Sequence, residues 1–97
     1  MKRKVYEQIF DEISSHFGLT KGDILTVTKK REVVDARQAI YYVCNKRGIK
    51  ISHIQSYLKQ DGYDVTHSTI IHGMGVVERT IENDEEYKRI INKICTH

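Results

Sequence analysis

Residues 64–74 read DVTHSTIIHGM, a short polar segment that runs directly into an apolar helical pattern. Thr66 can act as a helix N-cap, because its side chain can accept a hydrogen bond from a backbone N–H of the first turn. His67, Ser68 and Thr69 then occupy that turn and point outward. The stretch therefore predicts a helix with a polar, exposed N-terminal tip.

The apolar residues behind this tip form one stripe. Ile70, Met74, Val77 and Ile81 are spaced by four, three and four residues, which is the repeat of one helix face. The predicted helix over 66–81 thus buries one side and presents its tip, which offers donors and acceptors to base edges and a positive dipole end to phosphate. An ordinary capped surface helix has the same pattern, so this segment alone leaves both interpretations open.

Composition favours one all-α domain over residues 1–97. The chain has no proline, six glycines and 39% hydrophobic residues, which suits one modest core of helices joined by short turns. No stretch approaches the ~20 apolar residues of a membrane span, so we expect a cytoplasmic protein with no membrane partner. Cys44 and Cys95 are expected to stay reduced.

Apolar repeats and capping signals predict about six helices. They cover approximately residues 3–17, 20–26, 31–47, 51–59 and 66–81, and the stretch NDEE at 83–86 forms the acidic N-terminus of a last helix. The pair over about 51–81 is a predicted helix-turn-helix, in which the second helix enters the major groove. Gly73 and Gly75 interrupt that second helix, which indicates either close packing or limited stability there.

Charge is unevenly distributed along the chain. Residues 21–59 hold nine basic and three acidic residues, a net charge of +6, whereas residues 61–86 hold one basic and seven acidic residues, a net charge of −6. Such a dipole would draw a polyanion toward the middle of the chain. Two ordinary solvated helix faces of opposite charge would give the same net charges, so both interpretations stay open.

Three stretches resemble the C-terminal duplex-DNA-binding domain of the bacterial chromosomal replication initiator DnaA. They read HFGLTKGDIL at 16–25, KKREVVDARQ at 29–38 and THSTIIHG at 66–73. The last is similar to the family signature Asp-His-[Ser/Thr]-Thr-[Val/Ile]-x-x-[Ala/Ser]. The resemblance covers about residues 5–81 and implies a Trp-repressor-like helix-turn-helix fold with double-stranded DNA as its partner.

The resemblance also implies roles for single residues. Base contacts in the major groove are implied for Thr66, His67, Ser68 and Thr69. A basic loop is implied to reach the adjacent minor groove through Lys29 or Arg31, although lysine lacks the planar fork of the arginine that the family has at the position of Lys29. Contacts to the DNA backbone, which set register rather than sequence, are implied for Lys30, Arg37, Gln38, Lys46, Lys50 and Ser52.

This chain departs from the family pattern in three ways. Thr66 replaces an acidic residue, which removes a carboxylate that could accept from a cytosine or adenine amino group. The turn between Leu58 and His67 is longer than in the family. The GxxxxGK[ST] phosphate loop of the initiator's ATPase is absent from this sequence, so we expect no nucleotide or other cofactor and either a free-standing DNA reader or a part of a larger protein.

Catalysis and metal binding fit the sequence poorly. His67 or His72 could serve as a base for Ser68, but adjacent residues diverge on a helix and no acidic residue is placed to orient the histidine. His53, His67 and His72 lack the spacing of a metal-ligand pair with each other or with the cysteines. We therefore expect neither an enzyme nor a metal site.

Two further alternatives remain at this point. Tyr41, Tyr42, Tyr57 and Tyr63 could stack on single-stranded bases, but tyrosines on helices more often cover the edge of a core. The acidic surface at 78–86 or the apolar C-terminal helix could bind a protein partner on an inherited helix-turn-helix scaffold. The favoured prediction is a sequence-preferring, nucleoid-associated duplex-DNA binder that acts in replication initiation control or transcription regulation.

Overall fold

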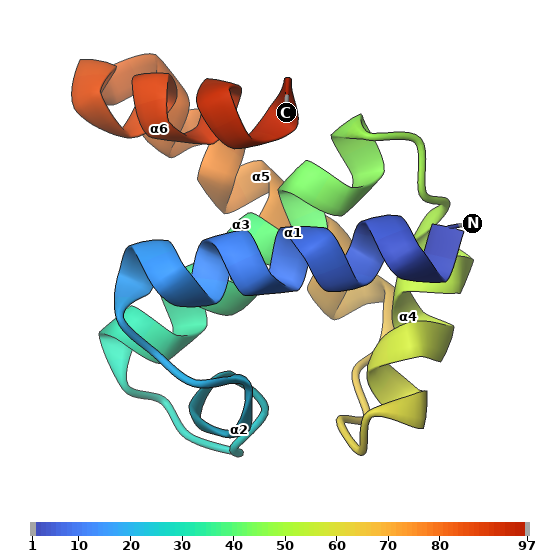
Figure 1. Cartoon of the computed structure of the whole chain (residues 1–97). Helices are drawn as coiled ribbons and strands as arrows, with labels where there is room; N and C mark the ends of the chain where they lie inside the picture. Colours follow the sequence, from blue (N-terminus) through green and yellow to red (C-terminus); the bar gives the residue numbers. More distant parts are fainter. Residues whose placement is uncertain (1, 97) are drawn as a thin grey trace.

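The computed structural model describes residues 2–96, which form six α-helices and no β-strand (Figure 1). The all-α prediction is confirmed, and the predicted helices are all present. Only the second helix is clearly shorter than predicted. The helices are α1 (Lys2–Phe17), α2 (Lys21–Ile24), α3 (Arg31–Lys46), α4 (Ile51–Gln60), α5 (His67–Asn83) and α6 (Glu85–Cys95).

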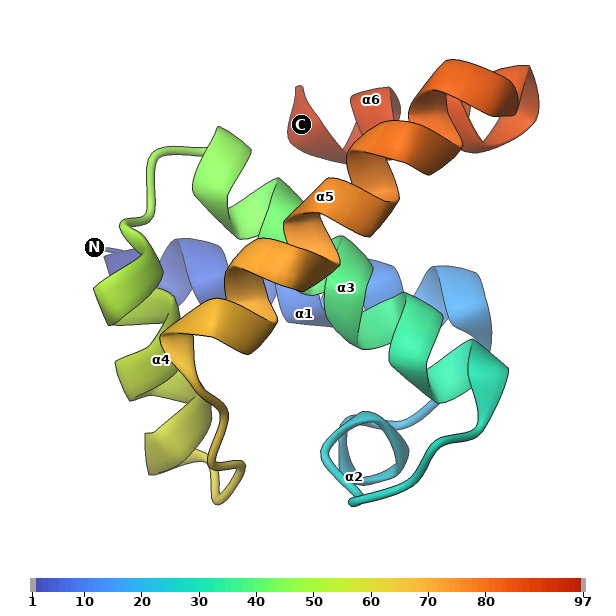
Figure 2. The same cartoon turned by 180° about the vertical axis from the view of Figure 1, so that it is seen from behind.

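Helix α3 lies at the centre of the fold, between α1 on one side and α5 on the other (Figures 1 and 2). Nine of its residues are buried, and one continuous apolar core joins it to the other helices. Tyr41 and Tyr42 are buried in this core, while Tyr57 and Tyr63 pack against it, so the packing interpretation of these tyrosines is confirmed. Cys44 lies in the same core, where burial raises the pKa of its thiol to about 12.

Gly73 marks the point where α5 crosses α3. A Cβ atom at Gly73 would lie 2.8 Å from Cδ2 of Tyr41 and 3.0 Å from Cγ of Gln38, which is too close for either atom to stay in place. Gly75 is different, because the nearest atom to an added Cβ is Nη1 of the flexible Arg79 side chain, at 3.5 Å. Close packing therefore explains Gly73 but not Gly75.

Local capping signals set several helix ends. Thr20 and Asp23 form a capping box that opens α2, and these hydrogen bonds hold the pKa of the Asp23 carboxyl below its usual value. Gly18, with φ +65°, follows the end of α1. Lys50 is the N-cap residue of α4, and Ser52 lies inside its first turn.

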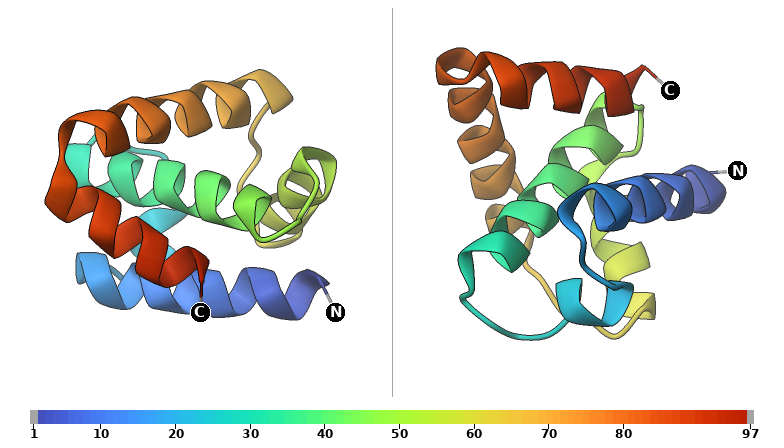
Figure 3. Two further views of the ribbon diagram at one scale, coloured as in Figure 1. Left: turned by 90° about the horizontal axis from the view of Figure 1, so that it is seen from above. Right: turned by 60° about the vertical axis from the view of Figure 1, so that its left-hand side comes forward.

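Two loops extend from the same side of the molecule. The loop between α2 and α3 and the turn between α4 and α5 lie on the side of α1 and α3 that faces away from α6 (Figure 3). No helix within residues 2–96 is both long enough and apolar enough to cross a lipid bilayer.

Candidate nucleic-acid interface

The N-terminus of α5 has the predicted cap. Thr66 adopts φ −84° and ψ 158°, and its Oγ1 accepts a hydrogen bond of 3.1 Å from the backbone N–H of Thr69. The two threonine hydroxyls also lie 2.8 Å apart. The cap is therefore a small hydroxyl pair that fixes the first turn without covering it.

The two residues between these threonines are exposed. Within residues 2–96, the side chains of His67 and Ser68 have no hydrogen-bond partner. The opposite side of the turn is anchored, since Val65 and Ile70 are both buried in the core at the positions of a hydrophobic staple. The tip 66–69 thus combines a fixed backbone with free polar groups at a helix N-terminus.

Ile71 is an exposed apolar residue that the sequence interpretation did not select. It is 51% exposed, and it follows His67 by four residues, so it lies on the same face of α5 one turn further along. The sequence does contain a signal for this exposure, because Ile71 lies outside the apolar stripe of the helix. The members of that stripe, Ile70, Met74, Val77 and Ile81, are buried or half-buried. The exposed face of α5 therefore includes an apolar group beside its polar tip.

The long turn before α5 is ordered by its own contacts. Gly62 has φ +92°, a left-handed conformation that favours glycine, and the next N–H, of Tyr63, bonds to the carbonyl of Leu58 at 2.9 Å. Gln55 of α4 donates from Nε2 to the carbonyl of Val65, also at 2.9 Å. Both ends of the turn are thus tied to α4.

Helix α4 is in turn tied to the N-terminal part of the fold through Asp61. Its Oδ1 lies 2.6 Å from Nη2 of Arg3, and its Oδ2 accepts from the hydroxyl of Tyr6 at 2.8 Å and from Nζ of Lys21 at 3.0 Å. Burial of Asp61 favours its neutral form, but these three donors outweigh burial and hold the pKa of the carboxyl below its usual value. One carboxylate therefore joins α1, α2 and the end of α4.

The predicted basic loop is exposed. Lys29 and Lys30 are exposed, and Arg31 is 90% exposed, with its Nε 3.8 Å from Oδ2 of Asp35. Val27, at 92% exposure, precedes them. The loop and the turn before α5 extend to the same side of α3 (Figure 2), so the structure brings the two predicted DNA-contacting segments to one side.

Arg37 lies mostly inside the protein. It was expected to hold the DNA backbone, but it is only 9% exposed and its guanidinium makes four hydrogen bonds inside the protein. At most one of its five N–H donors remains for phosphate. Its main contacts are with the loop after α2 and with the turn before α5, a role that local sequence did not reveal.

The remaining residues with a predicted contact to the DNA backbone lie at three places. Lys50 and Ser52 are exposed at the start of α4, and Gln38 is half-buried at the crossing of α3 and α5. Lys46 is separated from the basic loop, because it ends α3, about 22 Å along the helix from its start. Its Nζ lies 5.3 Å from the ring centroid of Tyr42, so the structure does not bring it together with the loop.

Acidic residues gather at the corner between α5 and α6, at the far end of α5 from its tip (Figure 2). Asp84 caps α6 by accepting from the N–H of Tyr87 at 3.0 Å, and Glu85 and Glu86 occupy its first turn. Carboxylates are favoured at that position by the helix dipole. The negative charge there thus has a local structural reason.

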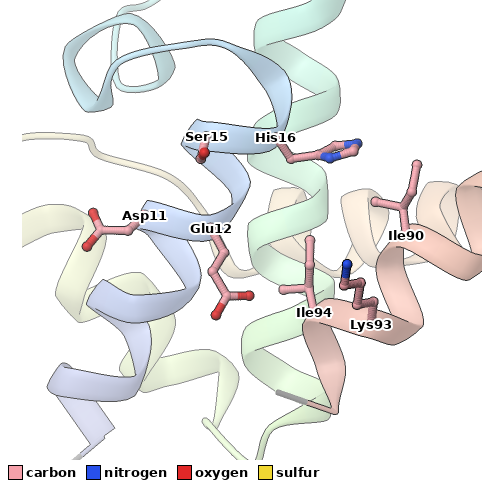
Figure 4. A pocket seen from close by; sticks show the side chains of 7 residues that line it. All are labelled: Asp11, Glu12, Ser15, His16, Ile90, Lys93 and Ile94. Carbon is pink, nitrogen blue, oxygen red and sulfur yellow. The ribbon is translucent and has the colours of Figure 1, made fainter.

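A groove of about 530 Å³ lies between α1 and α6 (Figure 4). Ile90 and Ile94 provide apolar surface, and charged side chains including Asp11, Glu12 and Lys93 surround it. It is on the other side of α1 from α2, away from the tip of α5 (Figure 1). Within residues 2–96, no cluster of three His, Cys, Asp or Glu side chains could hold a metal ion.

These observations define a class of protein. A short helix, an ordered turn and a second helix with an exposed polar N-terminus form a DNA-binding helix-turn-helix domain. Comparison with known proteins then identifies its family. The chain belongs to the bacterial DnaA protein helix-turn-helix family, whose model matches residues 6–77.

Curated relatives with the name chromosomal replication initiator protein DnaA agree with this assignment. The chain is 30% identical over 88 residues to the protein of Citrifermentans bemidjiense, an alignment that covers 91% of this chain and 19% of the relative. It is 31% identical over 91 residues to that of Chlorobaculum tepidum, covering 92% and 18%, and 29% identical over 94 residues to that of Bacteroides thetaiotaomicron, covering 96% and 19%. The chain thus spans about a fifth of these relatives, and no solved structure showed significant similarity to it.

Proposed function

We propose that this protein binds duplex DNA with sequence preference, placing the N-terminal half of α5 in the major groove and the basic loop 29–31 at the adjacent minor groove. The observation that carries this proposal is the exposed tip 66–69 on a helix whose opposite face is anchored in the core. A major groove admits one α-helix, and its base edges present donors and acceptors that side chains at such a tip can read.

The side chains at the tip favour particular contacts. The ring of His67 and the hydroxyl of Ser68 can donate to purine N7 or O6 or accept from exocyclic amino groups. Ile71 offers an apolar surface of the kind that contacts a thymine methyl group. Thr66 brings no carboxylate, so we expect a preferred site that differs from the family's at the base pair this residue approaches.

The cellular role follows from the relatives only as a proposal. Those proteins carry the name chromosomal replication initiator, and this chain matches about a fifth of their length. We infer a nucleoid-associated role in the control of replication initiation or of transcription, for example by occupying sites that an initiator also binds. Selection of bound duplexes from a random pool separates these roles, since recovery of the initiator's own box supports competition and an unrelated motif contradicts it.

Base reading is tested by replacing one tip residue. We expect His67→Ala to weaken binding to the selected site by about 1–3 kcal/mol and to reduce the preference over random duplex. His72→Ala is the matched control, because His72 is exposed on the same helix but lies about 140° around it from His67. Equal losses on selected and random duplexes would remove His67 from the base-reading set.

The alternative of a protein-interaction module predicts a different response to salt. Binding to duplex DNA releases counterions, so its affinity falls steeply as salt concentration rises. A module that binds only a protein partner through the acidic corner at 78–86 or through α6 has no such duplex affinity. Titration of a labelled duplex at several salt concentrations therefore decides between the two functions.

A further inference from the structure

We propose that Arg37 and Tyr63 lock the basic loop to the turn of the helix-turn-helix, so that the two DNA-contacting segments are held at a fixed spacing and engage the duplex together. This inference rests on the proposed function, because it assigns a positioning role within the same DNA-binding surface. It concerns Tyr63, a residue of the turn that is longer here than in the family.

The first half of the lock is the set of carbonyl groups around Arg37. Its Nε donates to the carbonyl of Ile24, and its Nη2 donates to the carbonyls of Thr26 and Thr28, each at 2.9 Å. Helix α2 has only four residues, too few to hold a stable conformation alone. The guanidinium therefore gathers the end of α2 and the loop after it around one point on α3.

The second half is the phenol of Tyr63. Its hydroxyl accepts from Nη1 of Arg37 at 2.7 Å, and its ring centroid lies 5.0 Å from the guanidinium carbon. The backbone of Tyr63 is itself fixed to the end of α4 through the carbonyl of Leu58. One side chain of α3 thus connects the loop after α2 with the turn after α4.

Both connections lie next to residues of the proposed DNA surface. The carbonyl of Thr28 directly precedes Lys29, and Tyr63 precedes His67 by four residues. Within residues 2–96, Arg37 has no carboxylate in ion-pair range. Three carbonyls and one phenol hydroxyl therefore accept its N–H groups, and no negative charge neutralises the guanidinium. Charge-assisted hydrogen bonds of this kind are stronger than neutral ones.

A lock of this kind changes how the two grooves are bound. A loop that is already in its bound position loses less conformational entropy on binding, so its contacts contribute more to affinity. Without the lock, the loop samples other positions and the contribution of Lys29 falls. The lock therefore predicts an energetic coupling between Tyr63 and Lys29, two residues on different elements.

The test uses Tyr63→Phe, which removes the hydroxyl and keeps the ring. The matched control is Tyr57→Phe, because Tyr57 is also half-buried, its ring also lies near an arginine, at 5.6 Å, and its hydroxyl makes no hydrogen bond within residues 2–96. Each change is combined with Lys29→Ala, and the affinity for the selected duplex is measured for every protein of the resulting double-mutant cycle. Amide hydrogen exchange is followed without DNA at Leu25 and Thr26, whose N–H groups are bonded at the end of α2.

We expect Tyr63→Phe to weaken duplex binding by about 3–10-fold, which is the net contribution of one typical hydrogen bond, and to reduce the effect of Lys29→Ala by at least about threefold. Exchange at Leu25 and Thr26 should become faster, while Tyr57→Phe changes neither readout. Unchanged exchange, or equal effects of Lys29→Ala in both backgrounds, overturns the lock. Failure of the proposed function is distinct, since the unchanged protein would then show no salt-dependent affinity for duplex DNA.

Discussion

The glycine pair in α5 gives the sharpest test of how this helix crosses α3. We predict that Gly73→Ala lowers the free energy of unfolding and that Gly75→Ala raises it, although the two positions are separated by a single residue on one helix. A pure helix-propensity argument predicts the same gain at both sites, about 0.8–1.0 kcal/mol. The difference between the two variants therefore isolates the packing contribution.

The magnitude follows from the distances at the crossing. A Cβ at Gly73 would lie 2.8 Å from Cδ2 of Tyr41, and the ring of Tyr41 is only 2% exposed, so it has no room to move away. Overpacking of this kind costs about 1–3 kcal/mol, which offsets or exceeds the propensity gain. At Gly75 the nearest atom outside the local helix backbone, within residues 2–96, is Nη1 of Arg79 at 3.5 Å, so the propensity gain remains.

Thermal and urea unfolding followed by far-UV circular dichroism measure this difference. For a domain of this size, about 1 kcal/mol shifts the melting temperature by roughly 4–8 °C. We expect Gly75→Ala to melt several degrees above the unchanged protein, and Gly73→Ala to melt at or below it. If both variants gained the same stability, the close crossing at Gly73 would be wrong, and with it the orientation of α5 on α3.

Four further predictions concern the interface and its supports. Asp61→Asn should cost about 1–3 kcal/mol at neutral pH. Because the pKa of Asp61 is lower in the folded state, its contribution is lost as pH falls below about 4, so urea midpoints of this variant and the unchanged protein should converge in acid. Lys30→Ala should reduce the slope of log affinity against log salt by about 0.9 on every duplex, and an unchanged slope would remove Lys30 from the phosphate contacts. Arg37→Ala should lower stability by about 2–4 kcal/mol, since it leaves one carbonyl of α2 and two of the following loop without their donor; a stable variant with only a reduced salt slope would favour a simple phosphate contact. Thr66→Asp keeps a good N-cap and supplies an acceptor, so selection from a random duplex pool should shift toward cytosine or adenine at one position.

The features that the sequence predicted correctly depend on neighbours in the chain. Helix bounds follow from apolar spacing and from caps such as Thr20 and Thr66, whose partners lie three residues away. The exposed tip of α5 follows from the same local rules, because the buried stripe and the N-cap leave only one side of the first turn free. Local periodicity was therefore enough for the fold class and for the tip.

The features that the sequence did not predict depend on contacts between distant segments. Arg37 looked like an exposed basic residue near other basic residues, and only the folded chain shows the carbonyls and the phenol that surround it. The carboxylate of Asp61 meets Arg3 across 58 positions of the chain, a pairing that no local pattern encodes. Arg37 and Tyr63 meet across 26 positions of the chain, and no local pattern encodes that contact either.

The link between α5 and α6 has a mechanical consequence for the tip at the other end of α5. Asp84 alone separates the two helices, as the C-cap residue of one and the N-cap residue of the other. Helix α6 is held by Ile91 and Ile94, both buried in the core. Because α5 is a continuous helix about 24 Å long, a shift along its own axis would also move α6 out of its packing position in the core. The junction with α6 at the C-terminal end of α5 thus fixes the axial position of the tip 66–69 at the N-terminal end.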